Sequence, residues 1–190
     1  NPENQIFMFS VERDIAFGLE NLGIPRETMR KMVDWAMDLL KIKHLALKAP
    51  YTLSDGQKQR VALAGVLAMK PDILILDEPT SLLDPHTASE LVLTVKELRD
   101  TLGMTILIVE HRLDLLANIA SRILVLRDGQ LVLDGHPREV LAKNEVIEAG
   151  VTVPVITMLH SMLSRKGVSL GESSLTVDEF VEKLKMVTHD

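Results

Sequence analysis

The sequence predicts an α/β fold that begins with helices and ends in a small helical extension. Strands are indicated by four short runs rich in Ile, Leu and Val, which are typical of strands buried in a protein interior. These runs are residues 73–77, 105–110, 122–127 and 130–134. A helical pattern of apolar residues joins the first two runs, and the order strand, helix, strand is typical of a parallel crossover unit.

The helices expected before the strands lie at residues 26–42 and at about 54–69. The first has apolar residues at helical spacing on an otherwise charged segment, which predicts an amphipathic helix. The second is expected to begin at Ser54, whose hydroxyl accepts a backbone hydrogen bond while Gln57 completes a capping box. It is expected to end before the Lys-Pro pair at residues 70–71, because proline disrupts a helix interior.

Turn and cap residues set the remaining boundaries. Residues 85–102 are expected to form the crossover helix, which ends at Gly103. Asp128-Gly129 predicts a hairpin turn between the last two strands. After the hairpin the pattern changes to helices, and Thr176 with Glu179 predicts another capping box.

The domain organisation expected from these elements has three parts. Residues 1–70 form a helical subdomain, residues 71–141 form the α/β core, and residues 142–190 form the carboxy-terminal helical extension. The chain starts at Asn1 without an initiator methionine, in a string that is typical of a loop inside a domain. We therefore expect that this start arises from truncation or processing.

Composition argues against several kinds of function. The chain has 190 residues, a formal net charge of −6 and no cysteines. Its charge gives no basic surplus for nucleic acid, and the lack of cysteines excludes disulfides, thiolate metal sites and cysteine nucleophiles. No apolar run approaches the roughly 20 residues that span a bilayer. Five histidines lack the spacing of a metal site and are expected at the surface or in loops: His44, His86, His136, His160 and His189.

Two adjacent carboxylates, Asp77 and Glu78, follow directly after an apolar run. Open α/β sheets bind ligands at the carboxyl ends of their strands, so this position suits Mg²⁺ and phosphate. In phosphoryl transfer the first acid can hold the metal through water, and the second can act as general base on the attacking water. The alternative is a strand followed by a capped turn, because Asp-Glu-Pro also suits the start of a helix.

The segment Leu53-Ser54-Asp55-Gly56-Gln57 places a hydroxyl, a glycine without Cβ and exposed N–H groups at the start of a helix. Such a start is suited to anions because its first N–H groups have no partner inside the helix. Taken alone, the segment is better explained as an ordinary helix cap.

The order of these features resembles the ABC ATPase family over roughly residues 1–141. The segment at residues 53–57 precedes the paired acids by about twenty residues, Ser81-Leu82-Leu83-Asp84 follows the acids, and His111 follows the next strand. They are similar to the signature, Walker B, D-loop and switch-histidine motifs of that family. The resemblance implies a P-loop NTPase-like fold that binds ATP and Mg²⁺.

The resemblance also implies a role for each matched residue. Asp77 would be the Walker B aspartate at the Mg²⁺, Glu78 the catalytic glutamate, and His111 the switch histidine that senses the γ-phosphate. Gln5 matches the Q-loop glutamine, which in such proteins contacts the Mg²⁺ or the attacking water; its alternative is an ordinary solvated side chain.

The dimers of this family imply further roles, because each signature motif completes the site of the other subunit. Ser54, Gly56 and Gln57 would bind the nucleotide held by a second ABC ATPase subunit. Asp84 and Ser81 would lie at the dimer interface. The pair could be a homodimer or a heterodimer.

Two departures from the family stand out. Asp55 replaces the usual glycine of the signature and adds a negative charge near the expected phosphate. The 190 residues also contain no Gly-x-x-x-x-Gly-Lys-Ser/Thr loop, and no aromatic residue matches the one that stacks on adenine in this family. That loop supplies most contacts to the triphosphate, so we expect no meaningful ATPase activity from this polypeptide alone.

Several phrases look like the energy-coupling factor (cobalt and vitamin importer) ATPases in particular: the start of the chain and residues 14–18, 21–23 and 61–68. This resemblance implies an integral membrane transport component as a partner, no nucleic acid, and a cytoplasmic location on the inner face of the membrane. It also implies that the helices expected at residues 151–163 and 176–187 help two subunits to stay together.

In that subfamily a groove receives a helix of the membrane component, and five apolar residues are candidates for its lining: Phe7, Phe9, Phe17, Leu22 and Met32. Ordinary core packing is the alternative for each of them. Trp35 is expected to anchor the core from its helix.

Two other functions stay open. The first is a non-catalytic half-domain that donates its signature motif to a complete ATPase, although Glu78 and His111 would be unnecessary there. The second is an ABC protein outside transport, acting on ribosomes or DNA, which would be expected to carry a second cassette or a basic extension.

Overall fold

The computed structural model describes residue 2 and residues 5–188, and the chain divides into two compact units, Asn1–Glu110 and His111–Asp190. Asn1 and His189 lie outside the described residues. The division at residue 110 differs from the boundaries expected near residues 70 and 141, and the three-part organisation stays a prediction.

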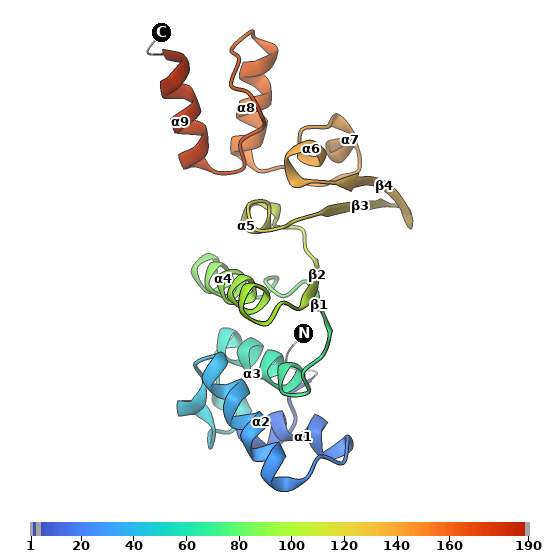
Figure 1. Ribbon diagram of the computed structural model, residues 1–190, viewed down its shortest axis with the longest axis vertical. Helices are drawn as coiled ribbons and strands as arrows, with labels where there is room; N and C mark the ends of the chain where they lie inside the picture. The colour runs from blue at the N-terminus through green and yellow to red at the C-terminus, as the bar shows by residue number, and fades with distance from the viewer. Residues whose placement is uncertain (1, 3–4, 189–190) are drawn as a thin grey trace. The chain divides into compact units, whose positions relative to one another are not determined.

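The first unit combines helices with a parallel pair of strands (Figure 1). Its elements are α1 Val11–Asn21, α2 Arg26–Leu39, the 3₁₀ turns η2 Lys43–Leu45 and η3 Pro50–Thr52, α3 Asp55–Ala68, β1 Ile73–Asp77, α4 Pro85–Leu102 and β2 Thr105–Val109. Strands β1 and β2 pair in parallel, with Ile73 opposite Thr105 and Asp77 opposite Val109. The predicted crossover unit of strand, helix and strand is therefore confirmed.

The helix cap and the helix end predicted from the sequence are both present in the structure. At the start of α3 the Gln57 N–H donates to Ser54 Oγ at 3.4 Å, and the Ser54 N–H donates to Gln57 Oε1 at 3.2 Å. The crossover helix α4 ends at Gly103, which has a left-handed backbone with φ 64°. Glycine adopts this conformation without the Cβ clash of other residues, so it ends the helix at that point.

The structure differs from the sequence-based expectations for the helices in two respects. The helix expected over residues 26–42 ends at Leu39, and Lys41 then takes a left-handed φ of 58° that turns the chain. Helix α1 was not predicted, although Val11, Ile15 and Leu19 recur every four residues and are all buried. The spacing was present in the sequence, but a helix of 11 residues depends on packing rather than on its own propensity.

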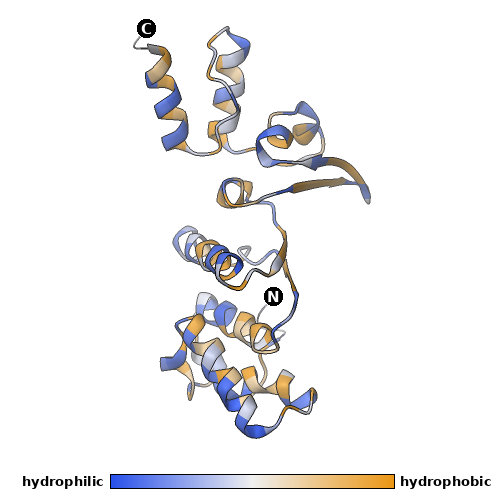
Figure 2. Cartoon of the chain, in the orientation of Figure 1, coloured by the Kyte–Doolittle hydropathy of each residue, from blue (hydrophilic) through white to orange (hydrophobic). Residues whose placement is uncertain are grey.

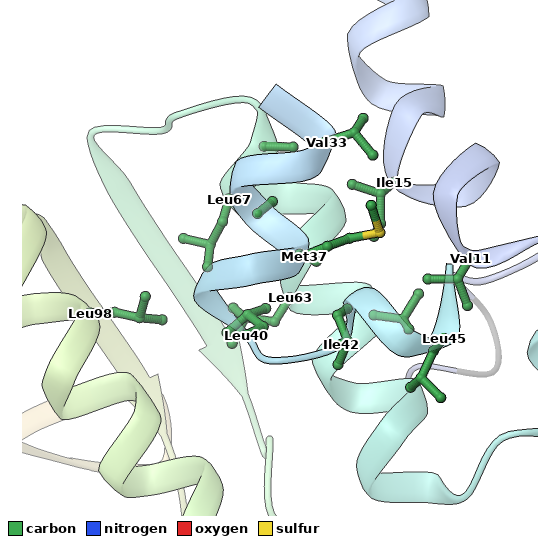
Figure 3. Packing of buried hydrophobic residues seen from close by; sticks show 14 of the residues in the cluster. Val11, Ile15, Val33, Met37, Leu40, Ile42, Leu45, Leu63, Leu67 and Leu98 are labelled. Carbon is green, nitrogen blue, oxygen red and sulfur yellow. The ribbon is translucent and has the colours of Figure 1, made fainter. Parts of the chain in front are cut away.

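The core of the first unit lies between α1, α2 and α3 (Figure 3). Ile15 of α1, Met37 of α2 and Leu67 of α3 are buried there together, and Leu98 extends the cluster to α4. Burial stabilises each such side chain by roughly 1.5–3 kcal/mol relative to exposure, so this cluster holds the helices in place. Trp35 packs against the cluster and is half-buried, with Lys70 Nζ 5.7 Å from its ring centre.

The two strands of the first unit are covered on one face only. Leu74 is buried and Leu76 is half-buried, whereas Ile75 is 64% exposed and Val109 is also exposed. The apolar runs led us to expect buried strands, and this expectation holds for one face. Side chains alternate between the faces of a strand, so packing against one layer of helices covers every second residue.

The second unit contains an antiparallel strand pair followed by short helices (Figure 1). Its elements are α5 Leu113–Leu116, β3 Ile123–Arg127, β4 Gln130–Gly135, α6 Pro137–Leu141, α7 Asn144–Glu148, α8 Val155–Arg165 and α9 Val177–Thr188. Asp128 and Gly129 both have positive φ, at 51° and 76°, and so form the predicted hairpin turn between β3 and β4. Hydrophobic colour runs along these two strands in Figure 2.

The carboxy-terminal helices correct one prediction and refine another. His160 is 4% exposed rather than at the surface, because the polar segment after α8 folds back and places Ser174 Oγ 3.1 Å from His160 Nδ1. In the predicted capping box the Glu179 N–H donates to Thr176 Oγ1 at 3.3 Å. The Glu179 carboxylate accepts from the Leu175 N–H at 3.2 Å rather than from Thr176. No helix among the described residues is long and apolar enough to cross a membrane.

Glu179 makes the stability of this extension depend on pH. Partial burial by itself would raise the pKa of Glu179, but hydrogen bonds from Arg138, Lys183 and the Leu175 N–H outweigh burial and lower the pKa to about 2. A lowered pKa contributes stability above the pKa of the unfolded chain, and this contribution disappears as pH falls from 4.5 towards 2. We expect Glu179→Gln to flatten the loss of stability in this window, as measured by urea unfolding at several pH values.

The matched control for this prediction is Glu182→Gln on the same helix, because Glu182 is exposed. This control is expected to keep the pH profile of the wild type. A profile for Glu179→Gln that parallels the wild type between pH 4.5 and 2 would contradict the prediction.

Candidate functional site

Asp77 and Glu78 stand at the carboxyl end of the parallel strand pair, as the sequence predicts. Asp77 is the last residue of β1 and lies opposite Val109 of β2. The Glu78 N–H donates to the Val109 carbonyl at 2.9 Å, which continues the ladder by one residue. Both carboxylates belong to exposed residues, so they are accessible to a ligand at this strand end.

The backbone of Glu78 departs from the strand immediately after this bond. Its φ is 46°, in the left-handed region that is uncommon for residues other than glycine. The Glu78 carbonyl accepts from the Ser81 N–H at 3.2 Å and from Ser81 Oγ at 3.0 Å. Such a backbone persists where surrounding bonds hold it, and strained residues of this kind cluster at functional sites.

Glu110 holds the same turn from the neighbouring strand, and we did not identify it from the sequence. Thr80 is 0% exposed, and its N–H donates to Glu110 Oε1 at 3.0 Å. The Thr80 hydroxyl donates to the same oxygen. Glu110 directly follows β2, in the same way that Asp77 ends β1. An acidic residue directly after the second apolar run was therefore the signal in the sequence that could have identified Glu110.

The signature segment lies at the amino end of α3. Ser54 and Gln57 use their side chains to cap each other. In the described part of the chain, the backbone N–H groups of Asp55 and Gly56 have no hydrogen-bond acceptor. Two outward N–H donors at a helix start suit an anion. The Asp55 carboxylate lies 3.6 Å from Lys58 Nζ, and this positive neighbour partly offsets its charge.

Asp84 and Gly56 both contact Thr87 in the first turn of α4. Asp84 caps α4 by accepting from the His86 N–H at 3.0 Å and from the Thr87 N–H at 3.1 Å. Hydrogen bonds from the Thr87 hydroxyl and backbone lower the pKa of Asp84. A Cβ built on Gly56 would lie 2.5 Å from Thr87 Cγ2, so the signature segment lies directly against this residue.

A cavity of about 20 Å³ lies between the start of α3 and the turn at residues 78–83. Its lining includes Asp55 and Gln59 of α3 together with Glu78 and Ser81 of the turn. A cavity needs roughly 10–15 Å³ to hold one water molecule, so this space suits water and is far too small for a nucleotide.

Gln5 and His111 are the remaining predicted site residues. Gln5 is exposed in a turn, where its N–H donates to the Pro2 carbonyl at 3.0 Å, and Pro2 lines the cavity described above. His111 is the first residue of the second unit, and its carbonyl accepts from the Leu113 N–H at 3.1 Å. The roles expected for Gln5 and His111 stay predictions.

The carboxylate of Asp77 at the end of β1 is of a type that suits Mg²⁺ held jointly with substrate phosphates. No cluster of three His, Cys, Asp or Glu residues with metal-binding geometry occurs among the described residues. Mg²⁺ is commonly held by one or two carboxylates together with water and substrate phosphates. Asp77 can supply such a carboxylate, whereas a group of three or more protein ligands is not present in the described ranges.

Three of the apolar residues expected to line a partner groove are exposed. Phe9 is 86% exposed, and Phe7 and Leu22 are also largely exposed, which argues against core packing for these three. Phe17 and Met32 are half-buried. The rings of Phe7 and Phe17 pack edge to face with their centres 4.8 Å apart. The half-buried Phe17 therefore packs against the exposed ring of Phe7.

Comparison with known proteins gives matches along almost the whole chain. The ABC transporter family model matches residues 3–81. The energy-coupling factor transporter ATP-binding protein EcfA1 of Caldanaerobacter subterraneus subsp. tengcongensis is 43% identical over 183 residues, which are 96% of this chain and 66% of the relative. The corresponding protein EcfA of Enterococcus faecium is 43% identical over 185 residues, which are 97% of this chain and 66% of the relative.

The solved structure of CbiO1 from Clostridium perfringens, described as part of the ABC transporter complex CbiONQ, is also similar. It matches with a TM-score of 0.71 at 42% identity, over 86% of this chain and 64% of that one. The chain thus spans about two thirds of the length of the relatives that it matches. The fold is that of an ABC ATPase domain of the P-loop NTPase class, and the chain belongs to the ABC transporter family.

Proposed function

We propose that this chain is part of the ATP-hydrolysing subunit of an ABC importer of the energy-coupling factor type. The observation that carries the proposal is the pair Asp77 and Glu78, held at the carboxyl end of β1 by the Glu78 to Val109 bond and by the turn around Thr80. The names of the similar proteins reported above, two energy-coupling factor transporter ATP-binding proteins and CbiO1, support this type of transporter.

Each residue of the site has a defined task in the proposed reaction. Asp77 would hold Mg²⁺ through water, and the ion would supply charge neutralisation on the phosphates. Glu78 accepts a proton from the attacking water through its carboxylate. His111 and Gln5 contact the terminal phosphate and the water, as the family resemblance implies.

A further set of residues serves a second subunit in this proposal. Ser54, Gly56 and Gln57 present the amino end of α3 to the nucleotide of the partner subunit, and the N–H groups available there support this role. Ser81 and Asp84 lie at the interface between the two ATPase subunits. The second subunit is either another copy of the same protein or a related ATPase.

The proposed membrane partner is an integral transport component. The exposed Phe7, Phe9 and Leu22 support a contact with an apolar helix of that component. The protein would then work at the cytoplasmic face of the membrane as a peripheral subunit. Because the 190 residues hold no Gly-x-x-x-x-Gly-Lys-Ser/Thr loop, we expect them to hydrolyse no ATP by themselves.

The test is Mg²⁺-dependent ATP hydrolysis by the native protein, isolated with its partner subunits. Asp77→Asn is expected to lower turnover at least about tenfold, because it removes the charge that holds the metal. Asp72→Asn is the matched control, since Asp72 is an exposed acid just before β1, and it is expected to leave turnover unchanged. A wild-type complex without Mg²⁺-dependent hydrolysis, or Asp77→Asn with wild-type turnover, would contradict the proposal.

A further inference from the structure

We propose that Thr87 is a positioning residue that ties the signature segment, residues 53–57, to Asp84, so that the two move as one unit. The inference rests on the proposed function, in which both segments face the second ATPase subunit. It assigns to Thr87 two separate contacts, one made by its hydroxyl and one by its methyl group.

The hydroxyl contact fixes the carboxylate of Asp84. Thr87 Oγ1 donates to Asp84 Oδ2 at 2.5 Å, while the N–H groups of His86 and Thr87 donate to Asp84 Oδ1. Both carboxylate oxygens are therefore engaged, and the side chain has one orientation that satisfies all three donors. Charge-assisted bonds of this kind are stronger than bonds between neutral groups.

The methyl contact sets the distance between the helices. A Cβ on residue 56 would lie 2.5 Å from Thr87 Cγ2, well inside the roughly 3.5–4.0 Å at which carbon atoms pack. Helix α3 can approach α4 this closely because Gly56 has no Cβ. The backbone of Gly56 has an ordinary φ, so the need for glycine here comes from space and not from conformation.

A second link between the same helices lies further along both of them. Arg60 follows Gly56 by one turn of α3, and Glu90 follows Thr87 by three residues on α4. The Arg60 guanidinium lies 3.0 Å from Glu90 Oε2. Two contacts, separated by a turn, fix the direction of α3 against α4 as well as the distance. A displacement of the signature segment is therefore transmitted to Thr87 and through its hydroxyl to Asp84.

The first test follows the carboxyl carbon of Asp84 by NMR during a pH titration of the chain. Thr87→Val keeps the methyl contact and removes the hydroxyl, so the pKa of Asp84 is expected to rise towards its ordinary value. Thr87→Ser keeps the hydroxyl and is expected to hold the pKa of Asp84 low. Thr94→Val is the matched control, because the Thr94 hydroxyl donates only to the Glu90 carbonyl of its own helix. An unchanged Asp84 titration in Thr87→Val would overturn the hydroxyl contact.

The second test is a double-mutant cycle between Gly56→Ala and Thr87→Ser. Gly56→Ala is expected to lower the urea midpoint of the chain, as followed by the fluorescence of its single tryptophan, Trp35. In the Thr87→Ser background the methyl is gone, so the same Gly56→Ala change is expected to lower the midpoint less. Effects that simply add would overturn the methyl contact.

The third test separates this inference from the proposed function. In the native complex, Thr87→Val is expected to lower kcat for ATP several-fold with a smaller change in KM, and Thr87→Ser is expected to retain more of kcat. Absence of hydrolysis in the wild-type complex would overturn the proposed function, and the first two tests would still decide the coupling. A wild-type complex that hydrolyses ATP, with Thr87→Val equal to it in kcat, would overturn the role of Thr87 in the reaction.

Discussion

Replacing Glu78 by glutamine is expected to lower ATP hydrolysis by the native complex about 10²–10⁴-fold while ATP binding is retained. Glutamine has nearly the same shape as glutamate but cannot accept the proton of the attacking water. The backbone bonds of Glu78, to the Val109 carbonyl and from Ser81, do not involve its side chain and should stay in place. The measurement is turnover at saturating ATP, together with equilibrium binding of ATP to the same preparation.

Two comparisons make this result specific. Glu97→Gln changes an exposed glutamate on α4 in the same way and is expected to leave both turnover and binding unchanged. Loss of ATP binding in Glu78→Gln would indicate a binding role for this residue instead of a proton-transfer role. Turnover within about twofold of the wild type would contradict the assignment of Glu78 as general base.

Replacing Glu110 by alanine is expected to lower the free energy of unfolding of the first unit by about 2–6 kcal/mol. The change leaves the N–H and the hydroxyl of Thr80 without their acceptor, and Thr80 is fully buried. A buried donor left without a partner costs about 1–3 kcal/mol, and this site has two. Urea unfolding of the chain followed by Trp35 fluorescence measures the effect, because Trp35 lies in α2 of the same unit.

The conservative variant distinguishes a hydrogen-bond role from a charge role for Glu110. Glu110→Gln keeps a carbonyl oxygen that can accept from both Thr80 donors, so it is expected to retain most of the stability. Glu97→Ala on the exposed side of α4 is expected to change stability by less than about 0.5 kcal/mol. If Glu110→Ala and Glu97→Ala unfold at the same urea concentration, the Thr80 to Glu110 link does not stabilise the unit.

Features that depend on near neighbours along the chain were predictable from the sequence. The capping box of α3 joins Ser54 to Gln57, three residues away, and the stop of α4 depends on the conformational freedom of Gly103. The Asp128-Gly129 turn likewise needs only two residues that accept positive φ. The paired acids at the end of β1 were placed correctly because a strand end follows directly from the apolar run before it.

Features that depend on distant partners were decided by the tertiary structure. Thr80 and Glu110 are 30 residues apart, and Gly56 contacts Thr87 across a separate helix. Helix α1 forms because its buried stripe packs against α2 and α3, and His160 is buried because a later polar segment folds over it. By itself the sequence determined the local caps, the turns and the order of the chemical motifs. Packing decided which side chains from different helices and strands are in contact. Local sequence preferences carry no information about these contacts, because the residues come together only when the chain folds.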